Sequence, residues 1–150
     1  MIARSTALPA AAMAALLAVP VALAAGLPAR AKYVGKTDDG SAVQLRVSPD
    51  SKRVAKMRIH YKVTCDNGDT GRTYTDILNP RLHSDGSFKG SGTYKGSGDG
   101  STNKFNVVGK LTARKATGTF SLTAVGTPQG TTGTIRCRTG LLHWQAARAH

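Results

Sequence analysis

The clearest candidates for chemistry are basic side chains that alternate with apolar ones in residues 55–65. Every second position in this segment is apolar, and the positions between carry Lys56, Arg58, His60 and Lys62. Alternate residues of an extended strand face opposite sides, so these four side chains are expected on one surface. Closely spaced cations attract phosphate, sulfate or carboxylate polymers. The pattern therefore predicts an anion-binding face.

Three arginines elsewhere in the chain are candidates for the same face. Arg46 belongs to the preceding alternating segment and joins the face if the two segments pair as a hairpin. Arg136 and Arg138 flank Cys137 and must point away from it. If a disulfide from Cys65 to Cys137 joins neighbouring strands of one sheet, the two arginines extend the row. If it crosses between packed sheets, they form a second patch on the opposite face. We favour the single patch.

The expected ligand of this face is an anionic component of the cell envelope or of the extracellular space. We do not expect nucleic acid as the physiological ligand, because no outward position in residues 55–65 carries an aromatic ring on which bases could stack. Two other interpretations stay open. The basic residues can be a solvated face that keeps the protein soluble, or the chain can be a protein-interaction or inhibitor domain with an unknown partner.

Signals for catalysis and for metal binding are weak. All eight acidic residues are Asp, so a zinc-protease motif that needs Glu is excluded, and no G-x-S-x-G nucleophile motif occurs. Gly35-Lys36-Thr37 resembles the end of a phosphate-binding loop but lacks the required first glycine. Among the acids, Asp76 alone falls within a predicted strand, as a residue of a hydrolase site could. We therefore expect no catalytic residue, cofactor or metal, and keep a loop-built hydrolase as the weakest alternative.

The first residues predict export. A short basic start is followed by an uncharged segment rich in Ala, Leu and Val, and small residues near position 25 provide a cleavage site. We expect a signal peptide at residues 1–25, with cleavage as late as residue 31, and an extracellular or periplasmic protein. The alternative, an uncleaved anchor, is disfavoured by Pro9 and Pro20. Removal of residues 1–31 leaves a net charge of +11, from 19 cations and eight Asp.

The two cysteines predict a disulfide. Cys65 and Cys137 are an even pair in a chain that we expect to reach an oxidising compartment. A metal site would need more ligands than these two. The bond would stabilise a core that is small in a chain of 150 residues.

The rest of the chain predicts one all-β domain over residues 32–150, which we expect to be monomeric. Alternation recurs in residues 43–47, 105–112 and 118–124, with clusters of Gly, Asp, Asn and Ser between such segments. Eight or nine short strands indicate an antiparallel sandwich or a small barrel with one disulfide. The expected core contains Tyr61, Phe105, Phe120 and Trp144, and residues 90–100 are expected to form a flexible hairpin loop.

Several segments together resemble a group of small exported bacterial β-proteins. They are residues 32–37, 43–48, 86–88, 118–120 and 137–140, with Cys65 and Trp144. The resemblance implies a β-fold and export. It implies no catalytic or binding residue, because its marks are turn glycines, core aromatics and a cysteine pair.

Overall fold

The computed structural model describes residues 26–96 and 100–150, and over these ranges the chain is all-β with no helix. The prediction of fold class is confirmed. No helix in the described residues is long and apolar enough to cross a membrane. The signal-peptide prediction for residues 1–25 lies outside the described residues. The nine strands that the structure describes are β1 (Lys32–Thr37), β2 (Ala42–Val47), β3 (Val54–Cys65), β4 (Thr70–Leu78), β5 (Ser87–Lys95), β6 (Thr102–Leu111), β7 (Lys115–Gly126), β8 (Ile135–Arg138) and β9 (Leu142–Arg148).

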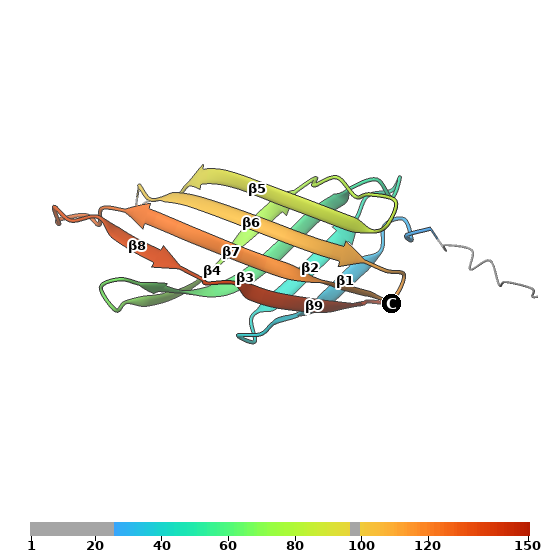
Figure 1. Cartoon of the computed structure of the whole chain (residues 1–150), viewed down its shortest axis with the longest axis horizontal. Coiled ribbons are helices and arrows are strands. Elements are labelled where there is room, and N and C mark those ends of the chain that lie inside the picture. The colour runs from blue at the N-terminus through green and yellow to red at the C-terminus, as the bar shows by residue number, and fades with distance from the viewer. Residues whose placement is uncertain (1–25, 97–99) are drawn as a thin grey trace, which may run out of the picture.

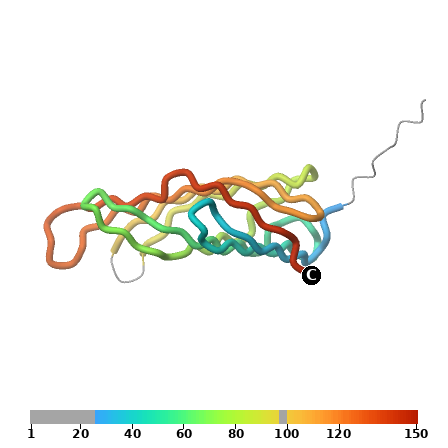
Figure 2. Tube along the Cα trace, turned by 90° about the horizontal axis from the view of Figure 1, so that it is seen from below, coloured from blue at the N-terminus to red at the C-terminus, as the bar shows by residue number. Residues whose placement is uncertain are grey.

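The strands form a flattened barrel with additional outer strands. Antiparallel pairing closes the ring β3-β2-β1-β9-β7-β8, in which β8 pairs with both β3 and β7. Strand β4 adds to the outer edge of β3, and β6 and β5 add to β7. The layer that contains β5, β6 and β7 crosses in front of β1–β4 (Figure 1), and the turned view shows how flat the body is (Figure 2).

The core lies between these two layers. Alternate residues of β2, β3 and β6 are buried, which is the period that the sequence predicted for them. Strands β2 and β3 form the hairpin on which the placement of Arg46 depends, and β6 and β7 form a second hairpin. The predicted core residues Tyr61, Phe105, Phe120 and Trp144 are buried. Hydrophobic burial of these rings and of the aliphatic residues around them holds the layers together.

The prediction of a flexible loop at residues 90–100 is wrong for its first half. Residues up to Lys95 belong to β5, which pairs along its whole length with β6. At Gly92 an aromatic ring occupies the space of a side chain. A Cβ atom on Gly92 would lie 2.7 Å from Cε1 of Phe105, whose backbone pairs with Gly92. Glycine in a strand marks close approach here and does not signal mobility.

Strands β4 and β5 are the first and last strands of the sheet, and the sheet curls so that they lie near each other. We call the boundary between them the seam. Isolated bridges from Arg53 to Arg81 and from Leu82 to Phe88 join the chain at one end of this seam. Among the described residues, no strand pairing joins β4 to β5 along the rest of it. The barrel wall is therefore incomplete at the ends of β4 and β5 that lie away from Leu82.

A single carboxylate ties the β1–β2 turn to β3. Asp39 accepts hydrogen bonds from the Thr37 hydroxyl, from the Ser41 amide at 2.9 Å and from the Lys62 amide at 3.2 Å. Burial raises the pKa of Asp39, but these hydrogen bonds outweigh it and lower the pKa to about 2. The ionised carboxylate of Asp39 thus accepts the hydrogen bond that the Lys62 backbone amide would otherwise donate to a neighbouring strand.

Asp39→Asn should lower the free energy of unfolding at pH 7 by about 1 to 2 kcal/mol, a modest loss because Asp39 is solvent-exposed. The ordinary pKa of 3.8 exceeds the folded value of about 2. The contribution is therefore present above pH 3.8 and is lost as the pH falls through about 2. Urea unfolding between pH 5 and 2 should show a shallower decline in the free energy of unfolding for the variant than for the wild type.

Asp69→Asn is the control, because the Asp69 carboxylate accepts a hydrogen bond only from Asn67 in its own turn among the side chains of the described residues. Equal declines for all three proteins would contradict this assignment.

Candidate functional site

Three cations lie directly opposite one another on the outer side of β1, β2 and β3. Lys32 pairs with Arg46, and Arg46 pairs with Lys56. Arg46 and Lys56 were predicted for this face, and the hairpin needed to bring them together forms. Side chains directly opposite in an antiparallel pair have Cβ atoms about 5 Å apart, and like charges at that spacing repel. Lys32 was not predicted as part of this face, because the residues around it do not indicate that its strand pairs with β2.

The cations line a shallow recess of about 280 Å³. Gln44 and Arg58 form the neighbouring outward-facing pair on β2 and β3, two residues along from Arg46 and Lys56, and they complete the wall of the recess. The amide of Gln44 adds a neutral hydrogen-bond donor to the charged donors around it. The recess is therefore surrounded by groups that donate hydrogen bonds to oxyanions, and we call Lys32, Gln44, Arg46, Lys56 and Arg58 the basic recess.

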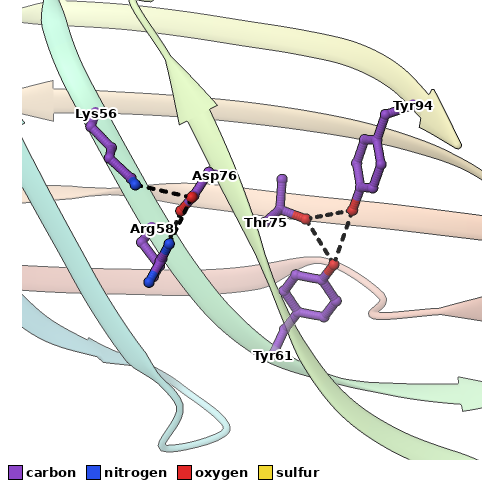
Figure 3. A network of polar contacts seen from close by, with 6 residues as sticks. All are labelled: Lys56, Arg58, Tyr61, Thr75, Asp76 and Tyr94. Atoms are coloured by element: carbon purple, nitrogen blue, oxygen red, sulfur yellow. Dashed lines mark hydrogen bonds and ion pairs between the residues drawn. The ribbon is translucent and has the colours of Figure 1, made fainter. Parts of the chain in front are cut away.

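Asp76 of β4 is the counter-ion at the edge of the basic recess (Figure 3). Its carboxylate accepts two hydrogen bonds of 2.7 Å from Nε and Nη2 of Arg58, and Nζ of Lys56 lies 3.0 Å away. Arg58, followed by Lys56, lowers the pKa of Asp76 to about 2. The group stays ionised at neutral pH, which suits ion pairing and is unfavourable for a general acid.

The ion pairs to Asp76 leave part of the recess unneutralised. Among residues 26–96 and 100–150, the salt bridges join Asp76 to Lys56 and to Arg58. Neither Lys32 nor Arg46 has a carboxylate partner within the described residues. Four cations and one carboxylate meet here, so the site has a net charge of about +3.

An aromatic ring lies beside the recess, which the sequence did not predict. Tyr74 of β4 pairs with His60 of β3, with ring centroids 5.4 Å apart, and the Arg58 guanidinium lies 4.4 Å from the centre of the tyrosine ring. The outward positions of residues 55–65 carry no Phe, Tyr or Trp ring, whereas Tyr74 reaches this face from the neighbouring strand. The ring holds Arg58 in place by a cation–π contact.

The remaining predicted cations lie further along the same outer side of β3. Lys62 pairs with Arg72 of β4, and Arg138 pairs with Thr64. The disulfide joins paired residues of the neighbouring strands β3 and β8, the case in which Arg136 and Arg138 were expected to extend the row. Eight residues separate Lys56 from Thr64, so Arg138 lies roughly 25 Å from the recess along the strand. These arginines belong to an extended strip and not to the recess itself.

Lysines on the opposite layer are arranged differently. Lys104 on β6 pairs with Thr93 and Thr123, and Lys110 pairs with Ser87 and Thr117. The cross-strand neighbours of these two lysines are uncharged. Directly opposed cations lie instead on the side of β1–β4, where Lys62 also pairs with Arg72.

No group of three or more His, Cys, Asp or Glu in the described residues could hold a metal ion.

Comparison with known proteins gives no family for this chain. No protein-family model, no curated protein and no solved structure matches the sequence, so the geometry of the basic recess carries the functional argument.

Proposed function

We propose that this protein is an exported, non-catalytic domain that binds an anionic polymer through the outer side of β1–β3. The observation that supports this function best is the row Lys32, Arg46 and Lys56, in which three cations are directly opposed on adjacent strands. Such a row costs stability in the free protein. A bound sulfate, phosphate or carboxylate group removes the repulsion and gains charge-assisted hydrogen bonds.

The layout favours a polymer over a single small anion. The recess has room for one or two anionic groups, while Lys62, Arg72 and Arg138 continue the positive strip along β3. A repeating polyanion can neutralise several of these positions in turn, and each contact releases counter-ions. Envelope polymers with phosphodiester groups and acidic extracellular polysaccharides have this repeat.

Export is the second part of the proposal. It is supported by the character of the leading segment and by the disulfide between Cys65 and Cys137, a bond that persists in oxidising compartments. An envelope or extracellular polymer is then the anionic material that the protein meets.

Lys32→Ala with Arg46→Ala should weaken binding to heparin, used as a model polyanion, by about tenfold at low salt. The slope of log affinity against log salt should become shallower by about 2, one unit for each lost cation. Asp76→Asn should act in the opposite direction and tighten binding several-fold, because Lys56 and Arg58 lose their counter-ion. Titration of heparin at several salt concentrations measures both changes.

The matched control is Lys104→Ala with Lys110→Ala, which removes the same charge from the opposite layer. This control should alter heparin affinity by less than about threefold. Equal weakening by the two double variants would show that heparin responds only to net charge, and the recess would then be a solvated face. Copurification with one protein partner, together with unchanged heparin binding by the Lys32 and Arg46 variant, would favour the interaction-domain alternative.

A further inference from the structure

A cavity at the β8 end of the barrel lies apart from the basic recess, and it has two parts that are both open to solvent. The more apolar part, beside β8, measures about 300 Å³ and is called the deep part, and the more polar part, at the seam, measures about 610 Å³ and is called the mouth. Val63, Thr73, Ser101 and Asn103 line both parts, so the deep part and the mouth are continuous. Small-molecule sites in proteins commonly have volumes of roughly 300 to 1,000 Å³.

The cavity exists because inward positions at this end carry small side chains. In the middle of the barrel, the inward residues Ile59 and Phe120 are fully buried and fill the space between the layers. Further along the same two strands, the inward positions hold Val63 and Ala124, which are only partly buried. Opposite Val63, β4 has Gly71. These residues are too short to meet across the barrel, so the apolar core stops before the end of the strands.

A row of cross-strand pairs, which runs over five neighbouring strands, gives the cavity a polar end and an apolar end. Tyr94 pairs with Asn103, Asn103 with Ala124, Ala124 with Cys137, and Cys137 with Cys65. The row thus runs from a phenol and an amide at the seam, across a methyl group, to the disulfide. All but Tyr94 line the deep part, and Tyr94 and Asn103 line the mouth.

Hydroxyl groups at the seam hold the polar end in place. The Thr75 hydroxyl is 2.8 Å from the hydroxyl of Tyr61 and 2.8 Å from that of Tyr94, each within a hydrogen bond (Figure 3). Tyr61 is buried, whereas Tyr94 is 36% exposed at the mouth. Burial raises the pKa of Tyr61, which keeps this network neutral. Each hydroxyl retains capacity to accept or donate a further hydrogen bond.

We propose that this cavity binds an uncharged small molecule with an apolar body and one hydroxyl or carbonyl group. The apolar body lies between Val63, Leu122 and Ile135, and the polar group faces the Asn103 amide and the Tyr94 hydroxyl. The seam between β4 and β5 is the entrance, since no strand pairing closes it along this stretch of the described chain. The deep part shares no residue with the basic recess or its counter-ion, whereas Tyr74 and Asp76, which contact Arg58, also line the mouth.

The neutral dye N-phenyl-1-naphthylamine is a suitable probe, because a positive surface does not attract it. The full chain should bind one dye molecule with saturable fluorescence enhancement. Ala124→Phe places a ring in the deep part and should weaken dye binding by at least about tenfold. Ala147→Phe makes the same change at an exposed position on β9 and should leave dye binding unchanged. Heparin binding should be the same in both variants, which separates this test from that of the proposed function.

Methyl chemical shifts of the wild-type protein provide a test that does not depend on folding of the variants. On dye addition, the methyl signals of Val63, Leu122 and Ile135 should shift, while those of the exposed Val34 and Val108 should not. Shifts confined to Val34 and Val108, the absence of saturable dye binding, or equal binding by folded Ala124→Phe and the wild type would overturn the proposal.

Discussion

Replacing both cysteines by alanine should lower the free energy of unfolding by about 4 kcal/mol, the largest loss that we expect from this fold. The bond spans 72 residues, and a loop of this length restricts the unfolded chain strongly on the chain-entropy model. The folded state should also suffer, since β8 has only four residues, Ile135–Arg138. Without the bond, its attachment to β3 depends on two paired positions, at Thr64 and Cys65.

Urea unfolding of Cys65→Ala with Cys137→Ala, with and without dithiothreitol, measures this effect. The wild type should be stable without the reductant and should approach the variant in its presence. The variant itself should not respond to the reductant, because Cys65 and Cys137 are the only cysteines in the chain. A stability loss below about 1 kcal/mol would show that the bond adds little to the closure of the barrel.

Gly118→Ala should destabilise the protein by about 3 kcal/mol, although it adds a single methyl group. Gly118 pairs with Trp144 on one side and with Gly109 on the other. A Cβ atom at residue 118 would lie 2.6 Å from Cζ2 of Trp144 and 2.8 Å from the Gly109 Cα, and it would also overlap the Val108 carbonyl oxygen. Two of these neighbours are backbone atoms, so the clash is relieved only by moving a strand or the indole.

Gly71→Ala is the matched control for this substitution. It also places alanine in a strand, but the nearest atom to its Cβ would be Cγ2 of Val63 at 3.7 Å, an ordinary contact. Thermal unfolding followed by the fluorescence of Trp144, the one tryptophan in the chain, compares the two variants. A similar stability for both would contradict the steric argument and would leave only the general cost of replacing glycine.

Other features of the barrel depend on contacts that no single segment contains. The clearest case is Asp76, which stood out in the sequence as the one acid in a predicted strand. A strand position is compatible with catalysis and with ion pairing alike. The structure shows ion pairing, because β4 pairs with β3 and brings the Asp76 carboxylate to Arg58 and Lys56.

The basic recess was partly predictable for the same reason. The outward positions Lys56 and Arg58 follow from alternation within β3, and Arg46 follows from a short hairpin turn. Lys32 joins them through the pairing of β1 with β2, and Tyr74 arrives from β4. The ring of Tyr74 was not predictable from residues 55–65, because it belongs to the next strand.

Local physics explains which elements of this fold were predictable from the order of the amino acids. Alternation with a period of two is set by the geometry of an extended chain, so the strands, their buried faces and the short hairpins could be predicted. Two cysteines in a chain that was expected to be exported were enough to predict their bond.

Three features emerge only in the folded chain: which strand lies beside which, the closure of the ring through β8, and the cavity at the seam between β4 and β5. These features depend on register and on side-chain volume compared across the barrel. Ala124 and Val63 are unremarkable in their own strands, and they leave a cavity only because the opposing wall is equally short. The same holds for Gly92 of β5, where the ring of Phe105 from the paired strand β6 occupies the space of a side chain.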